Sequence, residues 1–288
     1  MNVHTLFIVC SHRTLCRRSF FRMTAGMATF AAIVTAAATG ALTDSTPAWG
    51  AEPTVQNGSS VESDAAFRAA IHMAEQSLQA SEALSDYECI FHKRERHGRK
   101  LLSHKMVLKY RHEPFSVYMK YIDPYAGREV LYVDGKFNNK LLAHETGLKG
   151  LAGTLAFDPV CTEAMAECRY PVTKIGMHQM MATVLEQWKS EERISRCEVT
   201  YYPNAKLGDR DCKVIATTHP KELPGLKFCK TRLYIDKETN SPVRVEQYGF
   251  PTKKNDEPLL EEYTYSELRL NAGLDDFDFS PKNSSYGF

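Results

Sequence analysis

The chain has 288 residues, of which 43% are hydrophobic and 25% charged, and its formal net charge is +1. This composition is typical of a globular protein and excludes a chain dominated by low-complexity sequence. Residues 1–50 hold four of the 36 basic residues and one of the 35 acidic residues, so 32 basic and 34 acidic residues remain beyond them. A nearly balanced charge offers no electrostatic basis for binding nucleic acid, and we expect no such partner.

The first fifty residues resemble an export signal of the twin-arginine type. The pair Arg17 and Arg18 precedes a weakly apolar run over residues 23–42, and no acidic residue occurs before that run ends. Small residues near Gly50 and Ala51 predict cleavage there. A retained membrane anchor is the alternative, because the apolar run is about twenty residues long. We expect a protein of the periplasm or cell envelope, with no membrane span after processing.

A single α+β domain is predicted over residues 64–280, after a flexible polar lead at 51–63 and before a C-terminal tail at 281–288. Its first element is a helix from Asp64, a candidate N-cap, to about Ala83. Apolar residues recur along one side of this helix at the spacing of an amphipathic helix: Phe67, Ile71, Ala74 and Leu78.

Residues 87–111 read as two strands around His97-Gly98, which predicts a half-buried antiparallel hairpin. With a two-residue turn at that position, the pairs on the apolar face are Tyr87 with Leu108, Cys89 with Met106, and Phe91 with His104. His92 and His104 then lie on opposite faces, so they cannot form a cross-strand metal pair. We expect His104 to be a core histidine.

The remaining elements extend the same sheet. Strands are predicted at 115–121, 128–133, 140–144, 195–202, 211–218, 227–236, 243–250 and 259–270. A glycine-containing connection over 145–170 leads to a second helix from Ile175 to about Glu192. About ten strands in meander order predict one strongly curved antiparallel sheet, an open half-barrel with helices covering its concave mouth.

Six cysteines follow residue 50: Cys89, Cys161, Cys168, Cys197, Cys212 and Cys229. In an oxidising compartment, an even number favours disulfide bridges over free thiols. The sequence has no Cys-x-x-Cys and no His/Cys cluster with ligand spacing, which disfavours metal or redox chemistry. We therefore expect structural bridges or buried thiols, and the pairing stays open.

Six blocks of sequence carry a family resemblance: Asp86-Tyr87-Glu88-Cys89, Lys93-Arg94-Glu95-Arg96, residues 111–118, Gly127-Arg128-Glu129-Val130, residues 140–144 and Asp158-Pro159. Together they resemble the bacterial family called domain of unknown function 1571, over about residues 86–270. That resemblance implies no established activity. The order of elements is more distantly similar to the periplasmic lipoprotein carriers LolA and LolB and to the N-terminal domain of the sensor RseB. Their open barrel, lidded by helices, holds acyl chains.

The carrier resemblance implies a protein that binds a lipid or an acylated, lipoprotein-like ligand in an apolar cavity. A curved sheet under helices encloses apolar space, and methionines make an adaptable lining. The candidate lining residues are Phe91, Met106, Leu108, Phe115, Val117, Met119, Met177, Met181 and Trp188. The alternative is that these side chains fill a closed core in a disulfide-braced envelope protein that binds a partner protein.

Catalytic motifs are missing from the sequence. Gly-x-Ser-x-Gly, His-Glu-x-x-His and Gly-x4-Gly-Lys do not occur. Residues 275–278 are acidic but lack the spacing of a Ca²⁺ loop, so a solvated segment is expected there. We expect a protein that is not an enzyme and has no cofactor or metal. A hydrolase or metalloenzyme is a distant alternative, because twin-arginine export often serves proteins that load a cofactor before export.

Overall fold

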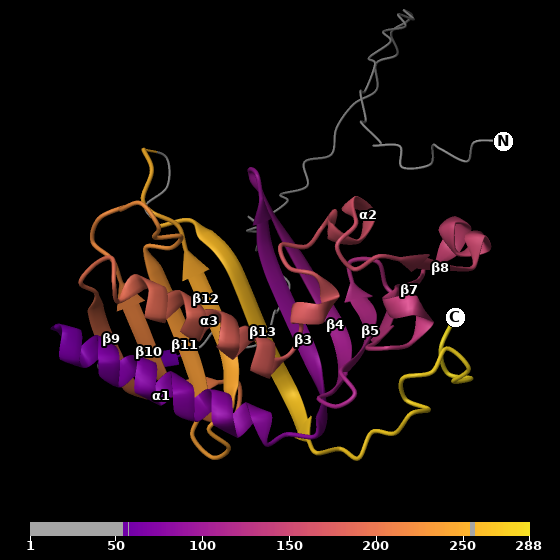
Figure 1. Cartoon of the computed structure of the whole chain (residues 1–288), viewed down its shortest axis with the longest axis horizontal. Helices are drawn as coiled ribbons and strands as arrows, with labels where there is room; N and C mark the ends of the chain where they lie inside the picture. Colours follow the sequence, from indigo (N-terminus) through magenta and orange to yellow (C-terminus); the bar gives the residue numbers. More distant parts are fainter. Residues whose placement is uncertain (1–53, 57, 254–256) are drawn as a thin grey trace, which may run out of the picture. The chain divides into compact units, whose positions relative to one another are not determined.

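The computed structural model describes residues 54–56, 58–253 and 257–288 (Figure 1). The twin-arginine pair and the expected cleavage site lie outside these residues. The described helices are α1 (Asp64–Glu82), α2 (Thr162–Met165) and α3 (Met177–Glu191), with short 3-10 turns η1 (Phe137–Asn139), η2 (Gly147–Ala152) and η3 (Val172–Lys174). Across this part of the chain, none of the helices has the length and apolar character needed to cross a membrane.

The described strands all belong to one antiparallel sheet. They are β1 (Thr54–Gln56), β2 (Ser59–Glu62), β3 (Asp86–His97), β4 (Lys100–Arg111), β5 (Ser116–Asp123), β6 (Glu129–Val133), β7 (Leu141–His144), β8 (Thr154–Phe157), β9 (Glu198–Leu207), β10 (Arg210–Thr218), β11 (Lys230–Asp236), β12 (Pro242–Tyr248) and β13 (Leu259–Leu270). The spatial order is β1-β9-β10-β11-β12-β13-β3-β4-β5-β6-β7-β8, and β2 also pairs with β9. The sheet is an open half-barrel, as the sequence predicts.

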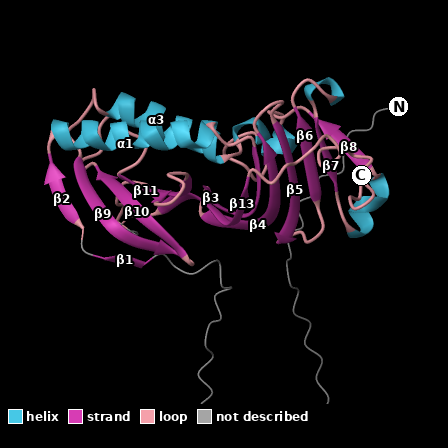
Figure 2. Ribbon diagram, turned by 90° about the horizontal axis from the view of Figure 1, so that it is seen from below, coloured by secondary structure: helices cyan, strands magenta, loops and turns pink. Residues whose placement is uncertain are grey.

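The two long helices lie side by side over the strands β9 to β12 (Figures 1 and 2). We call the side of the sheet that α1 and α3 cover the helix face, and the other side the opposite face. Further along the helix face, α2 is followed by a segment that contacts β4 through Glu167 and β3 through Cys168. The C-terminal residues instead pack on the opposite face, where the Tyr286 ring stacks on that of Tyr118 with 3.9 Å between centroids.

The boundaries of α1 agree with the predicted helix to within one residue. Its N-cap is Ser63 rather than Asp64, because the Ser63 hydroxyl accepts a hydrogen bond from the Ala66 N–H at 3.0 Å. The predicted apolar stripe is buried at Phe67, Ile71 and Ala74, as expected of a helix that packs on a sheet.

The hairpin between β3 and β4 forms in a different register from the predicted one. His97 pairs with Lys100, so the two turn residues are Gly98 and Arg99, with Gly98 at a φ of +59°. Each partner therefore moves by two residues, and the pairs are Tyr87 with Tyr110, Cys89 with Leu108, and Phe91 with Met106. An even shift leaves every side chain on its predicted face. His104 is buried as predicted, but it lies opposite Lys93 rather than Phe91.

Three segments are more ordered than the sequence suggests. Part of the expected flexible lead forms β1 and β2, which both pair with β9. The glycine-containing connection holds β8, which pairs with β7. The acidic segment 275–278 is exposed over residues 275–277, as expected, but it is also anchored, because Lys109 donates to Asp278 at 2.5 Å and Arg111 donates to Asp276 at 2.9 Å.

Candidate functional site

The predicted lining residues lie together in one apolar cluster between the helices and the sheet, which we call the apolar layer. Eight of the nine are at most 5% exposed, and Phe115 is partly buried against them. The layer holds five buried methionines, Met106, Met119, Met177, Met180 and Met181. The side chains that the sequence singled out are thus brought together, and in this structure they are packed.

The start of α3 is fixed to the hairpin by a glycine and a tyrosine. Gly176 has a φ of +119°, and a Cβ atom at this position would collide with the Tyr110 ring. That ring stacks on Tyr87 with 4.7 Å between centroids. The Met177 N–H then donates to the Tyr87 hydroxyl at 2.9 Å. This end of α3 is therefore held on β3 and β4, with its methionines facing the apolar layer.

The other end of α3 rests on polar side chains. Glu191 lies 3.2 Å from His219, and both side chains are at most 3% exposed. Gln187 donates to Glu191 at 2.9 Å and to the Thr231 hydroxyl at 3.2 Å, and it accepts from Gln247. Because buried polar groups need partners in one particular arrangement, these contacts define where α3 sits on β11 and β12.

A polar segment, Glu167 to Tyr170, covers the helix face near β3, β4 and β13. Glu167 lies 3.5 Å from His104 and accepts from the Tyr125 hydroxyl at 2.8 Å. The contact with His104, helped by those with Tyr125 and Arg128, outweighs burial and lowers the pKa of Glu167 to about 2. We call residues 167–170 the polar clamp.

The rest of the polar clamp is engaged as well. Arg169 forms an ion pair with Glu261 at 2.6 Å, and the Tyr170 hydroxyl donates to Glu261 at 3.0 Å. The Arg169 N–H donates to Glu95 at 3.0 Å. The clamp therefore joins the long connection to β3 and β13 through hydrogen bonds and ion pairs.

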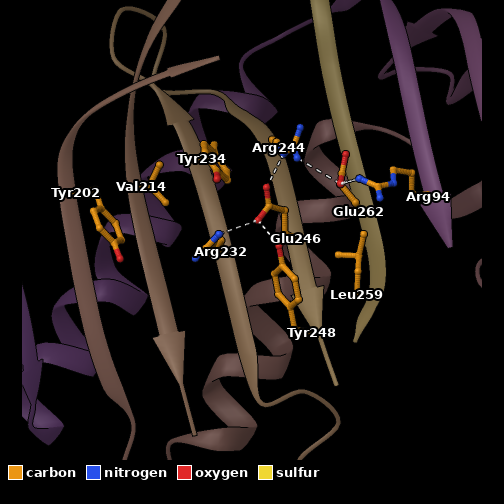
Figure 3. Close-up of a pocket in the computed structure, with 10 residues that line it drawn as sticks. All are labelled: Arg94, Tyr202, Val214, Arg232, Tyr234, Arg244, Glu246, Tyr248, Leu259 and Glu262. Atoms are coloured by element: carbon orange, nitrogen blue, oxygen red, sulfur yellow. Dashed lines mark hydrogen bonds and ion pairs between the residues drawn. The ribbon is translucent and has the colours of Figure 1, made fainter. Parts of the chain in front are cut away.

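A pocket of about 540 Å³ lies on the opposite face, away from α1 and α3 (Figure 3). It is lined by ten residues from six strands: Arg94, Tyr202, Val214, Arg232, Tyr234, Arg244, Glu246, Tyr248, Leu259 and Glu262. The sequence reasoning missed this pocket. A usable signal was the alternation of Arg244, Glu246 and Tyr248 in β12 with Val245 and Gln247, which places three polar side chains on one face of a strand.

The centre of the pocket is a row of charges across four neighbouring strands. Arg232 is paired with Glu246, Glu246 with Glu262, and Glu262 with Arg94. Two glutamates directly opposite each other would repel. Arg244 removes this conflict, because it donates to Glu246 at 2.8 Å and lies 3.3 Å from Glu262.

All six cysteines beyond residue 50 are free thiols in this structure, so the expected bridges are not found among the described residues. Four of them are buried: Cys89, Cys197, Cys212 and Cys229. Burial raises the pKa of Cys197 and Cys212 to about 12, and that of Cys229 to about 11. Buried thiols with raised pKa values are unreactive at neutral pH. In the described residues, no group of three or more His, Cys, Asp or Glu could hold a metal ion.

Comparison with protein families decides where the chain belongs. The model of the family described as protein of unknown function DUF1571 matches residues 84–288. The chain belongs to the DUF1571 family. The predicted membership is therefore confirmed, and the match covers the hairpin, the polar clamp, α3 and all strands from β3 to β13. A search of curated proteins found no match.

Some solved structures are also similar to this chain, at low sequence identity and with TM-scores below 0.5. The lipoprotein LppX from Mycobacterium tuberculosis is 14% identical, with 74% of this chain and 99% of that chain covered and a TM-score of 0.43. A DUF1329 family protein from Desulfovibrio piger is 14% identical, covering 75% and 97%, with a TM-score of 0.34. A LolA superfamily protein from Nitrosomonas europaea is 9% identical, covering 73% and 96%, with a TM-score of 0.30. Similarity at this level assigns no function to this chain.

Proposed function

We propose that this DUF1571 protein is exported to the periplasm or cell envelope and binds a lipid or acylated ligand in its apolar layer, as a carrier or sensor without catalysis. The observation that carries the proposal is the set of five buried methionines between a helix pair and a curved sheet. Methionine side chains are unbranched and flexible, so they can rearrange around a guest more easily than branched ones. The resemblance of residues 1–50 to an export signal supports the compartment.

Ligand entry requires movement, because the apolar layer is packed in the described structure. Burial of an acyl chain contributes about 0.8 kcal/mol for each methylene, which can offset a rearrangement of several side chains. Opening would have to displace α3, because α1 and α3 cover the layer from outside the sheet and α3 is held at both ends, by Met177 and by Glu191. The hydrogen bonds of Gln187 and Glu191 would then stabilise α3 in its closed position when it returns to the sheet.

Native mass spectrometry tests the proposal on mature protein that has been exported by its host and never exposed to detergent. We expect an added mass close to one lipid or acyl peptide per chain, with the same compound recovered in an organic extract. A clean mass of the unliganded chain, in protein shown to be folded, would contradict the carrier function.

A matched pair of variants links the ligand to the apolar layer. Met181 is 0% exposed, and Met181→Gln keeps its length but places an amide in the layer, whereas Met181→Leu keeps the layer apolar. We expect the Met181→Gln protein to retain at least tenfold less ligand than the unmutated protein, and the Met181→Leu protein to retain as much as the unmutated protein. Thermal unfolding of both variants shows whether the difference is a loss of binding or a loss of fold. Equal retention in two folded variants would place the ligand elsewhere.

The second candidate is an envelope protein that binds a partner protein and has a filled core. The packing of the predicted lining residues favours it, since Leu108, Met177 and Trp188 are 0% exposed. The two candidates differ in a simple readout. A dye that fluoresces in apolar surroundings should become fluorescent if the apolar layer opens to bind a ligand, as in the first candidate. It should stay non-fluorescent if the core remains closed, as in the second.

A further inference from the structure

We infer that the pocket on the opposite face is a second binding site, which takes a small organic oxyanion: a carboxylate or phosphate group attached to an aromatic or short apolar body. The pocket lies on the other side of the sheet from the apolar layer (Figure 3). The inference therefore goes beyond the proposed acyl-binding function and does not depend on it.

The charge balance of the pocket favours an anion. Three arginines surround two glutamates, which leaves one positive charge in excess. Glu246 and Glu262 are only 3% and 6% exposed, and each contacts two arginines. Their negative charges are therefore compensated inside the network and do not face an incoming ligand.

The arginines differ in how many of their donors are engaged. Arg244 is 7% exposed and contacts both glutamates, so its role is to hold the network together. Arg232 is 36% exposed, and its polar contact within the described residues is an ion pair of 3.6 Å with Glu246. Arg94 is 31% exposed and donates to Glu262 through one nitrogen. Because a guanidinium carries five N–H donors, Arg232 and Arg94 can each bind an oxyanion, with two parallel hydrogen bonds where the geometry allows.

The side chains that line the pocket favour a ligand whose anionic group is attached to an aromatic ring or another apolar group. Tyr202, Tyr234 and Tyr248 contribute aromatic rings, and Val214 and Leu259 contribute apolar side chains. The guanidinium of Arg232 lies 5.8 Å from the centre of the Tyr248 ring. A volume of about 540 Å³ lies within the range of small-molecule sites, about 300–1,000 Å³.

Stability gives no sufficient reason for this network. Buried ion pairs lose solvation, and replacing them with apolar residues of similar volume is often neutral or stabilising. The neighbouring part of the opposite face does have an apolar cluster, which includes Val214, Tyr234 and Val243. Charged side chains have therefore been placed where apolar ones would pack, which is expected at a binding site.

The test titrates the mature protein with three probes followed by calorimetry: phenyl phosphate, inorganic phosphate and benzyl alcohol. We expect phenyl phosphate to bind saturably, and at least tenfold more tightly than either of the other two. Arg232→Gln should weaken phenyl phosphate binding at least tenfold, and Arg94→Gln should weaken it as well. Arg269→Gln is the matched control, because Arg269 is 68% exposed in a surface ion pair with Glu88 and lies outside the pocket.

Each possible result supports or overturns the assignment. Saturable binding that falls in both pocket variants and persists in the control supports it. If phenyl phosphate and inorganic phosphate bind with equal affinity, the proposal that the ligand carries an organic body is wrong. If benzyl alcohol binds as tightly as phenyl phosphate, the proposal that the site binds an anion is wrong. Unchanged binding in the folded Arg232 and Arg94 variants, or no saturable binding to the unmutated protein, would overturn the site itself. Thermal unfolding confirms that each variant is folded.

Discussion

The ammonium nitrogen of Lys93 lies 3.1 Å from the sulfur of Cys168 and 2.9 Å from the carbonyl oxygen of Glu167. This contact joins the middle of β3 to the polar clamp, across 75 residues of sequence. Burial alone would lower the pKa of Lys93, but the neighbouring Cys168 and Glu95 outweigh it and hold that pKa above its usual range. Lys93 is therefore a buried charged residue whose partners all lie on the helix face.

Thiol labelling should divide the cysteines into two groups. Cys161 and Cys168 are half-buried, whereas the other four thiols are buried. At pH 8 we expect a thiol reagent to modify at most two cysteines of the folded protein without residues 1–50 within minutes, and all six after unfolding. Mass spectrometry of the labelled peptides identifies which ones react. A total below six in the unfolded, unreduced protein would reveal disulfides and contradict the free thiols of this structure.

Loss of the Glu167 carboxylate should weaken the polar clamp in a way that depends on pH. The pKa of Glu167 is lowered to about 2, so its contribution is present above the unfolded value of about 4.3 and disappears as the pH falls toward 2. Because the side chain is 35% exposed, we expect Glu167→Gln to lower the free energy of unfolding by about 1–2 kcal/mol at pH 7.

Chemical denaturation at several pH values measures this effect. Glu163→Gln provides the control, since Glu163 lies on α2 nearby but is exposed. The difference between the Glu167 variant and the unmutated protein should shrink between pH 4.3 and pH 2. A difference that persists unchanged at low pH would show that the carboxylate charge is not what stabilises the clamp.

His92 should make stability rise with pH over a different range. Burial, with Lys105 and Arg244 nearby, lowers its pKa to about 4. The unfolded chain, with an ordinary value of about 6.5, then binds a proton more readily than the folded one between these two values. We expect the free energy of unfolding to increase by about 1–2 kcal/mol from pH 4 to pH 6.5 through this group.

Substitution of His92 isolates that contribution. His92→Gln should flatten the pH dependence between 4 and 6.5 relative to the unmutated protein, as followed by urea denaturation at each pH. His72→Gln serves as the control, because the His72 side chain is 70% exposed on α1. An unchanged slope in the His92 variant would mean that another group titrates in this range.

Two glycines with positive φ should respond very differently to alanine. Gly176 (φ +119°) has no room for a Cβ atom against Tyr110, whereas Gly98 (φ +59°) has nothing within 4 Å of that position. Gly176→Ala combines strain with a collision, and we expect a loss of about 2–4 kcal/mol in the free energy of unfolding. Gly98→Ala carries strain alone and should cost about 1–2 kcal/mol. Equal losses in thermal unfolding would argue against the close contact between Gly176 and Tyr110.

Local features of the fold could be predicted because they repeat over short stretches of chain. The apolar stripe of α1, the alternation in β3 and β4, and the placement of His92 and His104 on opposite faces follow from periods of 3.6 and two residues. The two-residue error in the hairpin shows the limit of such reasoning. Moving the turn to Gly98 and Arg99 preserves both faces, so the apolar pattern is compatible with either register.

The sequence alone predicted the family, most of the antiparallel strands, the two main helices and nine residues that the structure packs into the apolar layer, since patterns among neighbours along the chain carry this information. Only the tertiary structure decided that β13 pairs with β3, which brings Glu262 opposite Arg94. The same pairing completes the row of charges from Arg232 to Arg94, and with it the pocket on the opposite face. Pairing between distant strands depends on the free energy of the whole sheet, and no short stretch of sequence encodes it.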